Sequence, residues 1–273
     1  MTLLIHPTAV IHPGADLHDS VEIGAYVVIG DQVQVGPHTK VGHHAVIEGW
    51  TEIGADNHLF PGVIIGTEPQ DYKYQGTGGG VKIGDRNQIR EYVTIHRATG
   101  YQERTYVGSD NLLMANVHIG HNCYLGDQIV MANAVALSGH VHVESQANIS
   151  GVLGVHQFVH IGQLAMIGGM SRIIRDVPPC MLVAGNPARV RALNQVGLRR
   201  YGIQTLQEGD LIASLKQAFR LLYRSELNLK DALAEIEPLS PHPLLRHLCQ
   251  FLQDAQIQGR RGLTPGHRTL TMS

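Results

Sequence analysis

Aliphatic side chains recur at every sixth position along most of the chain. Counting in sixes from residue 5 to residue 173, 26 of 29 positions are Ile, Leu, Val or Met, and the exceptions are Asp71, Thr77 and Tyr101. The fourth residue after each aliphatic is usually small or β-branched, as at Ala9 and Val21, and the residue directly after it is often Gly. A fixed short period of this kind indicates a repeat architecture.

One hexad suffices for a short strand and a tight corner, with the aliphatic side chain pointing inward. Three hexads form one triangular coil, and stacked coils bury continuous ladders of Ile, Val and Leu. Parallel stacking also gives each strand hydrogen-bond partners in the neighbouring coils. We expect the glycines to supply corner dihedrals that other residues resist. The pattern therefore predicts a parallel β-helix over residues 1–185.

Two segments interrupt the period, and both are rich in Gly and polar residues. Residues 66–82 fill one coil's worth of sequence between Ile65 and Ile83, and residues 96–106 fill two hexads between Ile95 and Val107. We expect both to project from the β-helix as loops, and loops on a rigid scaffold are where functional residues tend to lie.

The repeat stops at Pro178 and Pro179, and residues 186–273 form a second, helical domain. One helical face carries Leu211 through Leu222, and further helices are expected near 228–237 and 244–256. A capping box is also expected, from Thr205 to Glu208.

Charge and composition narrow the class of protein. The whole chain has a net charge of −2, but residues 1–185 carry −7 and residues 186–273 carry +5. The basic half suits docking of an acidic partner, and nothing points to nucleic acid. The three cysteines have no paired spacing for disulfides or zinc, and no apolar run is long enough for a membrane span. We therefore expect a cytoplasmic protein.

Histidines cluster beside the two loops. His121 and His140 are one coil and one position apart, so they lie on adjacent coils at nearly the same corner, and Gly139 lies one coil beyond His121. Imidazole suits general-base work near neutral pH, and a backbone N–H such as that of Gly139 can stabilise an oxyanion. The His118-x-x-His121 spacing with His140 leaves a zinc site open as an alternative, as in β-helical carbonic anhydrases.

Several motifs make a family resemblance specific. They are QDYKY at 70–74, VTIHR at 93–97, GSDNLLM at 108–114, HIGHNC at 118–123, SGHV at 138–141, HQF at 156–158 and DVPP at 176–179. Together they resemble the acyl-ACP–UDP-N-acetylglucosamine O-acyltransferases, over nearly the whole chain. The resemblance implies a left-handed coil and a homotrimer with sites at the subunit clefts. It also implies transfer of an (R)-3-hydroxyacyl chain from acyl carrier protein to the 3-position of UDP-N-acetylglucosamine, the first step of lipid A biosynthesis.

The resemblance also implies roles for individual residues. His121 matches the general base, Gly139 the oxyanion donor, and Gly169 the position that limits acyl length. Asn194 and Arg200 match residues that hold the nucleotide. The family needs no metal and no cofactor besides the acyl thioester. The residues that match substrate-binding positions are Gln70, Asp71, Lys73, His96, His118, His140, His156 and Gln157.

Three positions depart from the family's pattern. Asn122 stands where an Asp often follows the base, so the catalytic pair joins His121 to an amide. Val196 and Tyr201 replace residues that contact the nucleotide, which puts those contacts in doubt.

Other functions stay open at this point. A sister UDP-acylglucosamine N-acyltransferase usually carries an additional N-terminal domain, and here the repeats begin by Ile5. A β-helical scaffold without activity would not need Asp71, Lys73, His121 and Gly139 at the family's positions. The zinc lyase remains the third alternative. The sequence alone leaves open whether the acceptor is a 3-hydroxyl or a 3-amino group, and it leaves the acyl length open as well.

Overall fold

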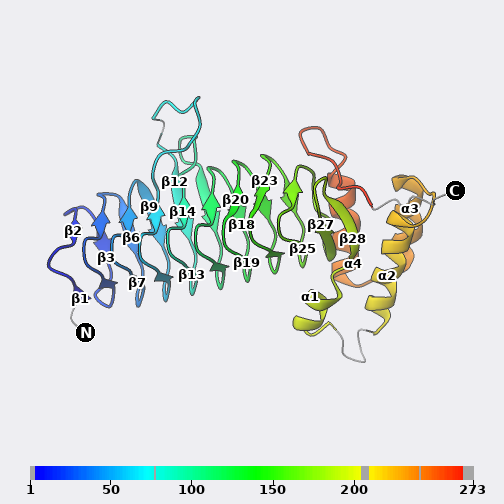
Figure 1. Ribbon diagram of the computed structural model, residues 1–273, viewed down its shortest axis with the longest axis horizontal. Coiled ribbons are helices and arrows are strands. Elements are labelled where there is room, and N and C mark those ends of the chain that lie inside the picture. The colour runs from blue at the N-terminus through cyan, green and yellow to red at the C-terminus, as the bar shows by residue number, and fades with distance from the viewer. Residues whose placement is uncertain (1–3, 77, 204–208, 240, 267–273) are drawn as a thin grey trace.

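The chain winds into a long left-handed parallel β-helix with a group of helices at its C-terminal end (Figure 1), which confirms the predicted fold. The computed structural model describes residues 4–76, 78–203, 209–239 and 241–266. Three parallel sheets form the faces of a triangular prism, and each coil contributes one short strand to each sheet.

The first sheet has 11 strands and continues furthest toward the C-terminus. All its neighbours pair in parallel except the last two, which form an antiparallel hairpin. In order across the sheet its strands are β1 (Leu4–Ile5), β4 (Glu22–Ile23), β7 (Lys40–Val41), β10 (His58–Leu59), β13 (Gln88–Ile89), β16 (Leu112–Leu113), β19 (Val130–Met131), β22 (Asn148–Ile149), β25 (Met166–Ile167), β27 (Met181–Ala184) and β28 (Arg189–Leu193).

The second sheet has nine strands and the third has eight. The second sheet contains β2 (Val10–Ile11), β5 (Val28–Ile29), β8 (Val46–Ile47), β11 (Ile64–Ile65), β14 (Thr94–Ile95), β17 (His118–Ile119), β20 (Val135–Leu137), β23 (Leu153–Val155) and β26 (Arg172–Ile173). The third contains β3 (Asp16–Leu17), β6 (Val33–Val35), β9 (Trp50–Ile53), β12 (Gly80–Ile83), β15 (Arg104–Val107), β18 (Tyr124–Leu125), β21 (His142–Val143) and β24 (His160–Ile161).

The sixfold aliphatic ladder forms the core of the prism. From Ile23 onward every aliphatic of the ladder is buried, whereas Ile5 at the N-terminal end is 37% exposed. The small residues four positions later are buried as well, as at Ala45 and Val117. Removing these side chains from water is the main stabilising contribution, at about 25 cal/mol for each Å² of apolar surface buried.

Most glycines directly after an aliphatic are required because the neighbouring coil leaves no room for a side chain. They do not supply left-handed corner dihedrals, so the expected role of these glycines is wrong. At most corners the third residue after the aliphatic has a left-handed backbone, and it is usually not Gly: Tyr26 has a φ of 57° and His140 a φ of 60°. Directly after the aliphatic, the chain passes against the next coil. A Cβ on Gly36 would lie 2.8 Å from the carbonyl carbon of Gly54, too close for any side chain.

Both predicted loops project from the same part of the prism (Figure 1). In an uninterrupted coil Ile5 pairs with Ile23, three hexads on, whereas Ile53 pairs with Ile83, five hexads on. The first loop therefore adds two hexads to a single side of one coil. Ile83 pairs with Val107, four hexads on, so the second loop adds one. The aliphatic positions of the repeat therefore stay paired with one another before and after both insertions.

The C-terminal region contains the three expected helices, α2 (Gly209–Tyr223), α3 (Leu229–Ile236) and α4 (Pro243–Asp254), with a 3-10 turn, η1 (Glu237–Leu239). A short helix, α1 (Gln195–Arg200), was not expected. The sheet also extends beyond residue 185, because β28 pairs with β27. The expected capping box at Thr205 and Glu208 lies outside the described residues.

Candidate functional site

The site is built at the corner that follows β17, where His121 and Asn122 lie side by side. Asn122 takes the left-handed residue of that corner, with a φ of 59°. This conformation brings its side chain back toward its neighbour, so that Oδ1 of Asn122 lies 2.9 Å from Nδ1 of His121. Asn tolerates left-handed backbone better than most residues, which helps to explain how it fits this position.

Surrounding groups fix the orientation of the Asn122 amide. Its Oδ1 accepts hydrogen bonds from the backbone N–H of Thr99 at 3.1 Å and from the Thr99 hydroxyl at 3.0 Å. Its Nδ2 donates to the Glu103 carboxylate at 2.6 Å. Because Oδ1 can only accept, the Nδ1 atom of His121 carries the proton. The Nε2 atom of His121 is therefore left with a lone pair, as a general base requires.

Gly139 lies one coil beyond His121 and directly against its ring. A Cβ at position 139 would overlap Nε2 of His121, so any side chain there would displace the imidazole. No acceptor among the described residues takes the Gly139 N–H. The structure thus places an available backbone donor beside the basic nitrogen, as the one-coil spacing predicted.

His140 and Phe158 extend the corner into the following coils. The His140 ring meets the His121 ring edge-on, with centroids 5.1 Å apart, and stacks on Phe158 at 4.8 Å. Burial lowers the pKa of His140, and the nearby His121 lowers it further. A neutral His140 next to His121 avoids a second positive charge beside the base.

His96 and His118 form a second pair, with ring centroids 5.2 Å apart. The Glu68 carbonyl oxygen accepts a 2.6 Å hydrogen bond from the Nδ1–H of His96, and Nδ1 of His118 lies 2.8 Å from the Thr94 hydroxyl. Burial lowers the pKa of both histidines. Within the described residues the buried Nε2 of His96 has no hydrogen-bond partner, so it offers an acceptor to a bound substrate.

The first loop leans over His121. Oδ2 of Asp71 lies 3.8 Å from Nε2 of His121, beyond hydrogen-bond range but close enough for a bound hydroxyl to reach both. Asp71 also accepts the backbone N–H of Lys73 at 2.9 Å, while the side chains of Gln70 and Lys73 are exposed. Arg97 anchors this loop through an ion pair with Glu68 at 3.1 Å and further hydrogen bonds.

Other expected residues lie farther from this cluster. His156 and Gln157 are exposed at the corner one coil beyond Gly139. Gly169 lies at a different corner, between the first and second sheets. Asn194 is 5% exposed and caps α1, which includes Arg200 and lies well away from the loops along the prism (Figure 1).

Tyr201 also points back to the prism rather than outward. Its hydroxyl donates to the Gln128 carbonyl at 3.2 Å. Val196 is 59% exposed. The departures from the family's nucleotide contacts therefore fall in the same short helical segment, outside the histidine cluster.

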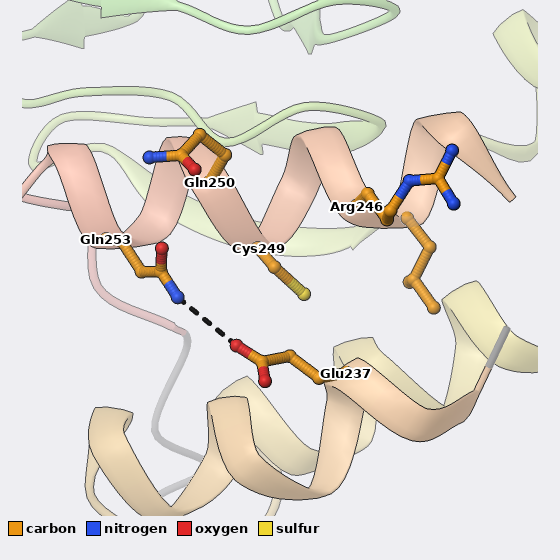
Figure 2. Close-up of a pocket in the computed structure, with 6 residues that line it drawn as sticks. Glu237, Arg246, Cys249, Gln250 and Gln253 are labelled. Carbon is orange, nitrogen blue, oxygen red and sulfur yellow. Dashed lines mark hydrogen bonds between the residues drawn. The ribbon is translucent and has the colours of Figure 1, made fainter. Parts of the chain in front are cut away.

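A hollow in the helical region has no connection to the histidines. Its volume is about 310 Å³ and it lies between α4 and the end of α3 (Figure 2). Gln253 bridges it with a 3.2 Å hydrogen bond to Glu237. Its other lining groups, which include Arg246, Cys249 and Gln250, form no arrangement suited to acyl transfer.

Metal-binding clusters and membrane-spanning helices are both lacking in the part of the chain that the structure describes. Within the described residues, no three His, Cys, Asp or Glu side chains gather closely enough to hold a metal ion. None of the described helices is both long and apolar enough to cross a bilayer.

The pattern of the sequence did not indicate Thr99, Glu103 or Arg97 as part of the site. All three lie in the second loop, where the period of six is lost. The loop's position beside the histidines was the available signal, because its polar residues are the ones that reach the corner after β17.

Comparison with known proteins points to one family. A family model described as UDP N-acetylglucosamine O-acyltransferase, domain 2, matches residues 176–264. The chain is 59% identical to the acyl-[acyl-carrier-protein]–UDP-N-acetylglucosamine O-acyltransferase of Gloeothece citriformis, over 81% of this chain and 79% of that protein. The corresponding Synechocystis enzyme is 56% identical over 82% and 80%.

Solved structures agree with these relatives. The UDP-N-acetylglucosamine acyltransferase of Francisella novicida superposes with a TM-score of 0.89 at 36% identity, covering 96% of this chain and 94% of that one. The UDP-N-acetylglucosamine O-acyltransferase of Moraxella catarrhalis gives 0.88 at 41% identity, covering 95% and 99%. The fold, the histidine corner and the extent of these matches lead to one conclusion: this chain belongs to the acyl-[acyl-carrier-protein]–UDP-N-acetylglucosamine O-acyltransferase family.

Proposed function

We propose that the protein transfers an (R)-3-hydroxyacyl chain from acyl carrier protein to the 3-hydroxyl of UDP-N-acetylglucosamine, the first step of lipid A biosynthesis. Family membership supports the reaction, and the observation that carries the mechanism is the His121 tautomer. With Nδ1 held by Asn122 at 2.9 Å, Nε2 is free to accept a proton. No cofactor is needed besides the thioester itself.

The steps follow from the positions of three groups. Nε2 of His121 takes the proton of the sugar 3-hydroxyl, and the oxygen attacks the thioester carbonyl. The resulting oxyanion accepts a hydrogen bond from the N–H of Gly139, which lies against the His121 ring. Collapse breaks the C–S bond, and the imidazolium returns its proton to the departing thiolate. The products are the 3-O-acyl sugar nucleotide and the free carrier thiol.

Asp71 and the second histidine pair suit the sugar. Asp71, 3.8 Å from the base, can accept a hydrogen bond from a sugar hydroxyl. The Nε2 atom of His96, unpartnered among the described residues, can accept another, and we assign His118 to the same surface. The residues that keep the expected role of contacting substrate around this centre are Gln70, Lys73, His140, His156 and Gln157.

Mass spectrometry of products tests the reaction directly. Purified protein is incubated with UDP-N-acetylglucosamine and a panel of 3-hydroxyacyl and unsubstituted acyl carrier proteins. We expect an O-acylated sugar nucleotide, formed fastest with one length of 3-hydroxyacyl chain. A 3-amino analogue of the acceptor shows which acceptor is preferred. Acylation only of a UDP-3-O-acyl-glucosamine would instead identify the sister N-acyltransferase activity.

We further propose a homotrimer with its sites between subunits. Asn194, Arg200 and Gly169 lie away from His121 within one chain (Figure 1), so a complete site needs these groups from a neighbouring copy. Light scattering at micromolar concentration should give three times the mass of the chain. A monomer that transfers acyl groups at full rate would refute the assembly.

Carrier protein is expected to dock on the helical region. Residues 186–273 carry a net charge of +5, and Arg220 and Arg224 are exposed one turn apart on or just after α2. Attraction between exposed charges weakens as salt screens it. Affinity for acyl carrier protein should therefore fall between low and moderate salt, and Arg220→Glu should lower it at low salt. If affinity for acyl carrier protein changes neither with salt nor with Arg220→Glu, the docking surface lies outside this helical region.

A further inference from the structure

The second loop brings a carboxylate to the far side of the Asn122 amide. Oε2 of Glu103, the residue directly before β15, accepts a 2.6 Å hydrogen bond from Nδ2 of Asn122. The same oxygen accepts the backbone N–H of Gly100 at 3.1 Å, which holds the carboxylate in place. Glu103, Asn122 and His121 thus form an unbroken chain of hydrogen bonds that ends at the basic Nε2.

We propose that Glu103 is a positioning residue for His121, acting through Asn122. This inference rests on the proposed function. In the His–carboxylate arrangement, an acid orients the imidazole and stabilises its protonated form. Here an amide contacts the imidazole, and the carboxylate lies one residue further along the chain of hydrogen bonds. Hydrogen bonds in series polarise one another, so the negative charge of Glu103 strengthens Oδ1 of Asn122 as an acceptor.

Geometry favours this role over a purely structural one. The Asn122 backbone is already held by Thr105, whose hydroxyl accepts its N–H at 2.9 Å, and its Oδ1 is held by Thr99. The corner therefore has other anchors. The contact with Glu103 adds a full negative charge to the chain of hydrogen bonds, at the amide group that also contacts the base.

The chemistry of the pair predicts a rescue. Asn122→Asp alone sets two carboxylates against each other, where a donor and an acceptor now meet at 2.6 Å. Like charges at such a distance repel unless a proton is shared. Glu103→Gln in the same chain restores a donor, because the new amide can face the new carboxylate. The double variant then carries the same charge as the natural pair, and a donor again faces an acceptor between residues 103 and 122, with the two groups exchanged.

The experiment compares kcat and KM for the natural protein, Glu103→Ala, Asn122→Asp and the Asn122→Asp/Glu103→Gln double variant. We expect Glu103→Ala to lower kcat about 10-fold, the effect of losing a hydrogen bond to a charged group, with KM for the sugar nucleotide nearly unchanged. Asn122→Asp should lose at least as much, and the double variant should recover most of the loss. Gln102→Asn, in the same loop, should keep the natural kcat.

A second readout is independent of turnover. The ¹⁵N shifts of the His121 ring, assigned by comparison with His121→Ala, report which nitrogen carries the proton. The natural protein should show the Nδ1–H form, and Glu103→Ala should show a mixture. If the natural protein transfers no acyl group, the proposed function fails, and the ring shifts still decide on Glu103. Natural kcat in Glu103→Ala, a double variant no better than Asn122→Asp, or unchanged ring shifts would each overturn the inference.

Discussion

Oδ1 of Asn122 lies 2.9 Å from Nδ1 of His121 and at the same time accepts the backbone N–H of Thr99. An amide at this position orients the ring as firmly as a carboxylate would, because the Thr99 N–H and the Glu103 carboxylate prevent the amide from turning over. The Asn122 amide differs from a carboxylate in being uncharged. The stabilisation of a protonated ring must therefore come from groups further away, and both Asp71 and Glu103 are near enough to contribute.

His121→Ala should lower kcat by ~10² or more, since positioned acid–base catalysis typically contributes that much. His38→Asn is a matched control, because His38 also lies at a corner, in an N-terminal coil, and has no place in the site. Rates and melting temperatures of the two variants would be compared. A folded His121→Ala protein with near-normal turnover would remove this residue from the mechanism.

Gly139→Ala should inactivate the enzyme while leaving its fold intact. The added methyl would overlap Nε2 of His121, so the ring must rotate away from Asn122 and from the acceptor. We expect kcat to fall by ~10² or more, as positioned base catalysis is lost, with a small change in melting temperature. An unchanged kcat would show that the ring does not need its present orientation.

The fold could be predicted from the sequence because one property, burial of an aliphatic at every sixth residue, determines it. Outside residues 66–82 and 96–106, the sixth positions from Ile23 to Ile173 follow that rule, and the structure buries the aliphatics of this ladder. The role of the glycines was misjudged, because the approach of one coil to the next, as at Gly36, cannot be read from local dihedral preferences. The helix α1 escaped prediction because it is short and lacks an apolar period of its own.

The site residues that belong to the hexad repeat could be predicted from the sequence, whereas those in the inserted loop could not. Gly139 lies one coil beyond His121 and His140 directly follows it, so the proximity of all three follows from the repeat. Glu103 lies in a loop that adds one hexad, and only the path of that loop brings it to Asn122. Asn194 was expected to contact a nucleotide, yet within one chain its side chain donates to the Leu164 carbonyl and caps α1.

Gly169→Met should shift the preferred acyl chain toward shorter lengths. Gly169 is exposed, and the nearest atom to an added Cβ is the Gly151 carbonyl oxygen at 3.3 Å, so a side chain would project outward from the prism. Each methylene excluded from the groove would lose about 0.8 kcal/mol of burial. Product analysis with carriers of several lengths measures the shift, and an unchanged profile would locate the limit at another residue.

The contact between α4 and the prism should depend on pH. Nε2 of His247 lies 2.6 Å from the Glu144 carboxylate, and this hydrogen bond raises the pKa of His247. A raised pKa means that the stabilisation is fully present below the ordinary pKa of histidine and is lost as pH rises through the folded value. The melting temperature of the natural protein should exceed that of His247→Gln most near pH 6. The difference should shrink toward pH 9, and a constant difference would contradict this assignment.

Insertions whose lengths are multiples of six leave the coils above and below in phase, as the pairing of Ile53, Ile83 and Val107 demonstrates. In such a scaffold the residues that determine the fold differ from the loop residues that surround the base. Exchange of residues 99–103 for a segment of equal length from a relative would alter the groups behind the Asn122 amide and leave the flanking ladder residues Ile95 and Val107 in place. Such grafted chimeras could tune the strength of the base in one enzyme while the remainder of the prism stays constant.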